Sequence, residues 1–128
     1  MRSVSDVKEL HSIKAVIKSF KPASRGILTS FVIGRNIKVH YTIALAVVAG
    51  GLYFHVTKVE FLILLVAISQ VITLEIVNTA IEKTIDLVTT EYHLYAKIAK
   101  DVAAGAVLLA SIIAVIIGGV IFLPYILN

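Results

Sequence analysis

The stretch that decides the fold is Val102–Leu127, VAAGAVLLASIIAVIIGGVIFLPYIL, which contains no charged residue. A membrane-spanning helix needs about 20 consecutive apolar residues, and this stretch is long enough. A second apolar stretch, Phe61–Ile81, is interrupted only by Glu75. A third, Tyr41–Val56, is slightly short unless its flanking residues extend it. The sequence therefore predicts three transmembrane helices, at about 39–57, 60–88 and 102–127.

The composition points to the same class of protein. Of the 128 residues, 59% are hydrophobic and 16% are charged, whereas a soluble domain averages about 45–50% apolar and about 25% charged residues. These figures exclude a soluble globular domain, a disordered chain and a collagen-like chain. The absence of cysteine excludes disulfides, cysteine-based zinc sites and iron–sulfur clusters. We expect an all-α integral membrane protein whose residues 1–128 form a single domain.

The positive charges indicate an orientation in the cell membrane. Eight of the twelve Lys and Arg residues precede residue 39, and cytoplasmic segments of membrane proteins carry such an excess. This bias predicts that the N-terminus and the connection 83–101 face the cytoplasm. A basic flank beside an apolar span also argues against nucleic acid as a partner. The eight residues are Arg2, Lys8, Lys14, Lys18, Lys21, Arg25, Arg35 and Lys38.

The segment 1–38 has the pattern of an amphipathic helix on the membrane surface. An apolar stripe and a basic stripe run side by side at helical spacing, which suits the headgroup layer of anionic lipids. A solvated arm is the alternative. Pro22 and Gly26 are expected to break the segment in two. The apolar stripe is Leu10, Ile13, Ile17 and Phe20, and the basic stripe is Lys14, Lys18, Lys21 and Arg25.

Acidic residues gather near the second apolar stretch. Glu75, Asn78, Glu82 and Asp86 have the spacing i, i+3, i+7 and i+11, so they share one face of a helix that continues to about residue 88. If this helix enters the bilayer near residue 60, Glu75 lies about 22 Å along it and Glu82 about 33 Å. A carboxylate inside the membrane is costly, which favours a functional role for Glu75 over a structural one.

This geometry suits phosphoryl transfer at the membrane surface. A desolvated Glu75 would act as a general base on a lipid hydroxyl, while Glu82 at the interface would hold a divalent cation. Lys100 would neutralise phosphate charge, and Asp101 or Glu91 would orient a nucleotide. The sequence contains neither a GxxxxGK[ST] nor a GxGxxG motif. A small proton-coupled transporter is the competing use of acids in a membrane, and His40 and His55 are interpreted as interface residues.

The run 75–82, EIVNTAIE, followed by Asp86 and by Lys100-Asp101, resembles the prokaryotic diacylglycerol kinase family. Arg35-Asn36, with Lys38 and His40, is similar to its Gram-positive branch of undecaprenol kinases. The resemblance implies a homotrimer with composite active sites between subunits, which uses ATP and Mg²⁺ to phosphorylate a membrane lipid alcohol. It implies that Glu75 is the general base and that Asn78 supports it. By the same resemblance, Glu82 binds metal and nucleotide, and the nucleotide also contacts Glu91, Tyr92, His93, Lys100 and Asp101.

The sequence departs from the family pattern at Gly34. Members typically carry a glutamate immediately before the Arg-Asn pair, and that glutamate is the second metal ligand. A glycine here removes a carboxylate from a Mg²⁺ site and is expected to loosen the helix by about 1 kcal/mol relative to alanine. Two alternatives to an undecaprenol kinase therefore stay open. One is a diacylglycerol kinase that makes phosphatidic acid, and the other is a weakly active or inactive family member.

Overall fold

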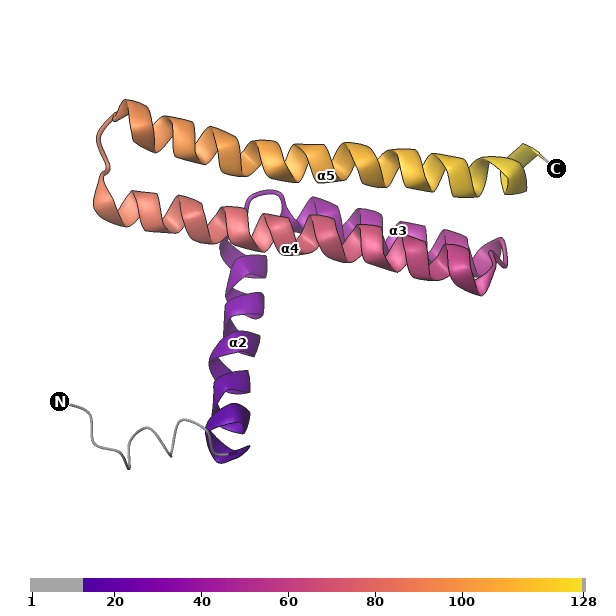
Figure 1. Cartoon of the computed structure of the whole chain (residues 1–128), viewed down its shortest axis with the longest axis horizontal. Helices are drawn as coiled ribbons and strands as arrows, with labels where there is room; N and C mark the ends of the chain where they lie inside the picture. Colours follow the sequence, from indigo (N-terminus) through magenta and orange to yellow (C-terminus); the bar gives the residue numbers. More distant parts are fainter. Residues whose placement is uncertain (1–12, 128) are drawn as a thin grey trace. The chain divides into compact units, whose positions relative to one another are not determined.

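The computed structural model describes residues 13–127, with side chains described from residue 16, and these residues form four α-helices (Figure 1). They divide into two compact units, one ending at Ile33 and the other beginning at Gly34. The first unit contains α2, and the second contains α3, α4 and α5. The predicted all-α class is confirmed. The helices are α2 (Ile13–Ile33), α3 (Ile37–Tyr53), α4 (Lys58–Val88) and α5 (Leu94–Leu127).

Helix α2 runs without a break through Pro22 and Gly26, so the predicted division of this segment is wrong. Proline cannot donate to the carbonyl four residues earlier, but this part of α2 is exposed and that carbonyl can bond to solvent. Ser24 adds a hydrogen bond to the carbonyl of Lys21 at 3.1 Å. Ile17 and Phe20 of the predicted apolar stripe are exposed. Leu10 and the rest of residues 1–12 lie outside the described residues.

Helix α3 ends at Tyr53, so the first predicted membrane helix does not reach residue 57. Thr57 instead begins α4 as its N-cap. Its Oγ1 accepts from the N–H of Glu60 at 3.3 Å, and the Glu60 carboxylate accepts from the N–H of Thr57 at 2.8 Å. This capping box ends the turn, and His55 reverses the chain direction at φ 53°.

Helix α4 agrees with the predicted range 60–88, but α5 begins at Leu94 rather than at residue 102. The predicted connection 83–101 is therefore mostly helical. Its second half contains good helix formers, and Lys97 Nζ lies 2.6 Å from Asp101 Oδ2 one turn later, a pair that supports a helix. Apolarity alone did not show this start, because the first turns of α5 are polar.

Helix α4 packs against both α3 and α5 in the second unit, where the three helices lie side by side (Figure 1). Its buried residues include Leu64, Ala67 and Val71. Helix α5 buries the small residues Ala103 and Ala110, and small residues let helix backbones approach closely in membranes. The three helices thereby hold the polar face of α4 against its neighbours.

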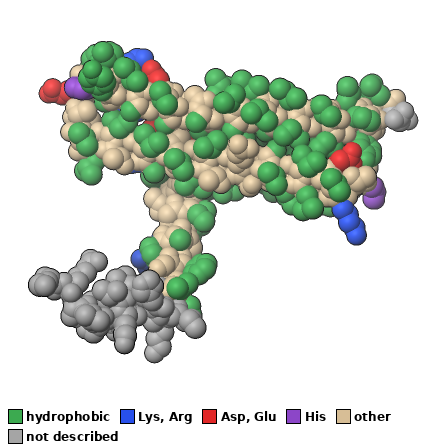
Figure 2. All heavy atoms as spheres, in the orientation of Figure 1, with side chains coloured by type: hydrophobic (Ala, Val, Ile, Leu, Met, Phe, Trp, Pro, Cys, Tyr) green, Lys and Arg blue, Asp and Glu red, His purple; other side chains and the backbone are tan. Residues whose placement is uncertain are grey.

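The second unit has the surface of a membrane protein. Within the described residues, α4 and α5 are each long and apolar enough to cross a membrane, and a third span results if α2 and α3 are counted as one broken span. The structure therefore supports two to three candidate membrane spans, where the sequence predicted three. Figure 2 shows hydrophobic side chains over the visible face, with charged ones toward the ends of the three helices. The chain is an integral, multi-pass membrane protein.

Candidate active site

Glu75 and Asn78 are buried on one face of α4, as their spacing predicts. They are 2% and 5% exposed. The backbone N–H of Asn36, the N-cap of α3, lies near the Glu75 carboxylate, and His40 and Glu82 lie near enough to interact with it electrostatically. The buried carboxylate of α4 therefore lies near polar groups of α3 and of the residues just before it, namely His40, the backbone of Asn36 and the charge of Arg35.

Asn78 connects the buried carboxylate to the next turn of the stripe. Its Nδ2 donates to Glu82 Oε1 at 3.5 Å. Its Oδ1 is buried and has no hydrogen-bond partner among the residues that the structure describes. Because buried polar atoms are nearly always paired, this oxygen is a place where a substrate group or an ion would gain a contact.

A cavity of about 350 Å³ lies beside these side chains, with walls from all three helices of the unit. Glu75 and Asn78 line it from α4, Asn36 and His40 from α3, and Ser111 from α5. The sequence pattern did not predict Ser111 as a site residue, and it placed His40 at the membrane interface. Ser111 did carry a signal, since it is the one hydroxyl-bearing residue between Val102 and Pro124.

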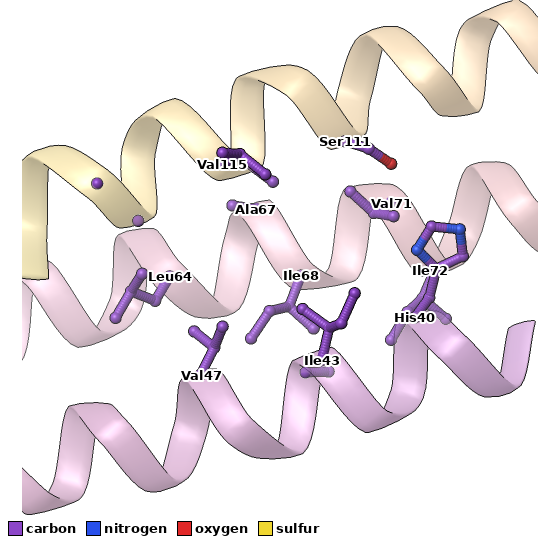
Figure 3. Close-up of a pocket in the computed structure, with 14 residues that line it drawn as sticks. His40, Ile43, Val47, Leu64, Ala67, Ile68, Val71, Ile72, Ser111 and Val115 are labelled. Atoms are coloured by element: carbon purple, nitrogen blue, oxygen red, sulfur yellow. The ribbon is translucent and has the colours of Figure 1, made fainter.

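An apolar groove of about 320 Å³ lies next to this cavity between the same helices (Figure 3). Its walls include Ile43 and Val47 of α3, Leu64 and Ile68 of α4, and Val115 of α5. His40 and Ser111 line both spaces. A polar chamber that holds a buried carboxylate thus adjoins a hydrocarbon-lined groove, an arrangement suited to an amphiphilic molecule.

The remaining predicted site residues lie outside this cavity. Glu91, Tyr92 and His93 are exposed in the connection between α4 and α5, where the Glu91 N–H donates to Thr89 Oγ1 at 3.2 Å. Asp101 pairs with Lys97. The structure therefore brings Glu75, Asn78 and Glu82 together. The other four predicted residues, Glu91, Tyr92, His93 and Asp101, do not line the cavity beside them.

Lys100 is held by the last residue of the predicted acidic stripe. Its Nζ lies 2.6 Å from Asp86 Oδ1, and Lys83 Nζ lies 3.3 Å from the other oxygen of the same carboxylate. Asp86 therefore joins α4 to α5 and fixes one end of the Lys100 side chain near the polar stripe.

The residues present fit a magnesium ion that arrives with a nucleotide. Mg²⁺ prefers oxygen ligands and is commonly held by one or two carboxylates together with substrate phosphates. Glu82 and the unpartnered Oδ1 of Asn78 offer such oxygens. The described residues contain no group of three His, Asp or Glu side chains that would hold a metal alone. Gly34 lies between α2 and α3, outside both helices, so the expected loosening of a helix is wrong.

The fold and the site define a helical membrane protein with a carboxylate-containing cavity for an amphiphilic substrate. A model of the prokaryotic diacylglycerol kinase family matches residues 21–122. The chain is 41% identical over 114 residues to undecaprenol kinase from Bacillus subtilis (strain 168), which covers 89% of this chain and 93% of that protein. It is also 41% identical over 114 residues to diacylglycerol kinase from Synechocystis sp., of which it spans 65%, just under two thirds. Diacylglycerol kinase from Escherichia coli (strain K12) is 29% identical over 101 residues, or 79% of this chain and 83% of that one.

The chain belongs to the prokaryotic diacylglycerol kinase family. It is a lipid kinase of that family, and the resemblance recognised in the run 75–82 is confirmed. The two relatives at 41% identity are named for different lipid substrates. The comparisons therefore show the family and leave both undecaprenol and diacylglycerol as acceptor lipids.

Proposed function

We propose that this protein transfers the γ-phosphoryl group of ATP to the hydroxyl of undecaprenol, a long polyprenol. The observation that carries the proposal is that the cavity lined by Glu75 and the apolar groove share two lining residues, His40 and Ser111. A lipid alcohol seated there would place its hydrocarbon chain in the groove and its hydroxyl beside the carboxylate.

Glu75 acts as the general base in this mechanism. Its carboxylate accepts the proton of the lipid hydroxyl as the oxygen attacks the γ-phosphorus and the bond to ADP breaks. The backbone N–H of Asn36 orients that carboxylate, and Asn78 supports it from the next turn. A general base contributes about 10²- to 10⁴-fold to a rate.

The nucleotide is held on the polar side of the same helices. Glu82 and Asn78 Oδ1 would bind the magnesium ion of Mg-ATP, which supplies charge neutralisation when bound. Lys100 neutralises the phosphates after exchanging Asp86 for the nucleotide. Glu91, Tyr92, His93 and Asp101 are assigned nucleotide contacts from the family resemblance. Because these residues lie outside the cavity, contacts from other subunits of a homotrimer would complete the site.

The site faces the cytoplasm in this proposal, where ATP is available. The basic N-terminal segment and Lys100 support this orientation through the positive-inside bias. Labelling of single cysteines by a membrane-impermeant maleimide in sealed right-side-out vesicles tests it. Thr90→Cys is expected to be protected from the reagent and Lys58→Cys to be labelled. The reverse pattern would overturn the orientation. The mass of the detergent-solubilised protein tests the homotrimer.

The central experiment is a phosphorylation assay on the purified chain in micelles with radiolabelled ATP and Mg²⁺. We expect turnover of undecaprenol, with a loss of about 10²- to 10⁴-fold in Glu75→Gln. The matched control is Glu60→Gln on the same helix. Glutamine also serves at this capping-box position, so activity should be kept. Equal turnover by Glu75→Gln and the native chain would remove Glu75 as the base.

The same assay with 1,2-dioctanoylglycerol decides between the two substrates named by the relatives. A kcat/KM for the diacylglycerol above that for undecaprenol would make the chain a diacylglycerol kinase instead. Gly34 favours a further candidate, a weakly active family member, because glycine offers no carboxylate at the position where the family resemblance implies a second metal ligand. Gly34→Glu should then raise Mg²⁺-dependent turnover severalfold, whereas robust activity of the native chain would exclude this candidate.

A further inference from the structure

Ser111 is a buried hydroxyl at the place where the apolar groove meets the Glu75 cavity. It lies on α5 and lines both spaces. Figure 3 shows it at the same end of the groove as His40, with its oxygen directed away from the α5 backbone. Its Oγ is buried and has no hydrogen-bond partner within residues 13–127, the part of the chain that the structure describes.

The missing partner sets Ser111 apart from four other hydroxyls of the three helices. A serine or threonine inside a helix ordinarily donates to a carbonyl three or four residues earlier. Thr42, Thr79 and Thr84 do so at 2.9 Å, and Ser69 does so at 2.8 Å. Ser111 has the same local option and does not use it. A buried polar group without a partner is costly, which points to a ligand as the missing partner.

Asn78 Oδ1 is the second buried polar atom without a partner in the described residues, and it lines the same cavity. The residues that bear these two atoms, Asn78 of α4 and Ser111 of α5, therefore line one cavity together with Glu75. Asn78 already has a place in the proposed mechanism. Ser111 does not, and it is the one of the two that also borders the groove.

We propose that Ser111 is a positioning residue for the acceptor lipid. This inference rests on the proposed function and names the group that holds the acceptor alcohol. The lipid hydroxyl donates its proton to Glu75 and accepts a hydrogen bond from the Ser111 O–H, which leaves its second lone pair free to attack phosphorus. The hydroxyl is thereby fixed at the mouth of the groove. The acceptor class is an alcohol whose hydrocarbon part occupies the apolar groove.

The kinetic test compares Ser111→Ala with the native chain, using undecaprenol at saturating Mg-ATP. One lost hydrogen bond should raise KM for the lipid roughly 3- to 10-fold. The kcat should stay within about 2-fold, because the contact is made in both ground and transition states. Ser111→Thr keeps the hydroxyl and should restore the native KM. Ser69→Ala, which removes a hydroxyl bonded to its own helix, is the matched control and should behave as the native chain.

A binding experiment without ATP separates this inference from the proposed reaction. Farnesol and the hydrocarbon of the same chain without the hydroxyl are compared by displacement of a fluorescent lipid in nanodiscs. The native chain should prefer farnesol roughly 3- to 10-fold, and Ser111→Ala should bind both equally. An unchanged preference in Ser111→Ala would overturn the role of Ser111. Lack of phosphorylation by the native chain, with the preference intact and dependent on Ser111, would instead overturn the proposed reaction alone.

Discussion

Two polar regions of the three-helix unit differ in how their polar groups are hydrogen-bonded. In the turn region, around Thr57, Glu60 and Tyr125, one carboxylate oxygen of Glu60 accepts three hydrogen bonds. They come from the Thr57 N–H at 2.8 Å, the Thr57 hydroxyl at 2.7 Å and the Tyr125 hydroxyl at 2.8 Å. In the site region, around Glu75, Asn78 and Ser111, two buried polar atoms have no partner among the described residues.

The contrast extends to packing. Phe54 lies against Phe122 and Tyr125 in the turn region, with ring centroids 6.1 and 6.5 Å apart. The site region instead encloses a cavity and a groove. Polar groups that satisfy one another stabilise a fold, whereas groups left for a substrate lower stability in the free protein. One helix, α4, therefore contributes to stability at its start and to chemistry further along.

The largest effect that separates the two regions is expected from Asn78→Leu. Activity should fall on the order of 100-fold, because the variant loses an oriented polar group beside the reacting carboxylate. The melting temperature should stay equal or rise, since a buried oxygen without a partner is removed. Turnover of undecaprenol and thermal unfolding in detergent, followed by circular dichroism, measure both. A variant that melts much lower yet keeps full turnover would show that Asn78 is structural.

The next largest effects are expected from a glycine-to-leucine substitution at two positions, one of which should affect stability and the other lipid binding. A Cβ added at Gly51 would lie 3.1 Å from the Phe61 ring, whereas at Gly118 it would meet no described atom within 4 Å. Gly51→Leu should therefore destabilise the protein by about 1–3 kcal/mol and leave the lipid KM unchanged. Gly118→Leu should fold normally and raise that KM about 10-fold, since Gly118 lines the groove. Urea titration and lipid saturation curves measure the pair, and the reverse pattern would contradict the assignment of the groove.

The sequence predicted what depends on local pattern. The buried face of Glu75 and Asn78, and the end of α4 at Val88, follow from helical spacing and agree with the structure. The polar start of α5 and the unbroken helix at Pro22 were missed, since both depend on ion pairs or exposure that hydropathy does not measure. Ser111 and His40 were missed as cavity residues for a different reason. They come from α5 and α3, and only tertiary packing places them beside Glu75 of α4.

A smaller effect, confined to stability, is expected at the start of α4. Thr57→Ala removes the side chain that caps Glu60 and should destabilise the protein by about 1 kcal/mol. Thr57→Ser keeps the hydroxyl and should preserve most of the stability. Neither variant should change kcat/KM for the lipid, because Thr57 borders neither the cavity nor the groove. Denaturant midpoints and turnover numbers are compared for both variants. A loss of activity in Thr57→Ala under conditions where the protein is fully folded would show that the turn region also contributes to catalysis.

The smallest effect concerns Lys100, a charge that is paired within the protein although it is assigned to the nucleotide. Asp86→Asn weakens the 2.6 Å pair and removes a negative charge near the incoming phosphates. KM for ATP should therefore fall roughly 3-fold, and less in high salt, since exposed pairs are weak and screened. Lys83→Gln is the control with the opposite expectation. It removes the second partner of Asp86, so Asp86 pairs with Lys100 alone, and KM for ATP should stay the same or rise. ATP saturation curves at two ionic strengths measure both variants. A rise in KM for ATP in Asp86→Asn would mean that Asp86 positions Lys100 for the nucleotide. The ion pair would then assist nucleotide binding, and Asp86 would not compete with the phosphates for Lys100.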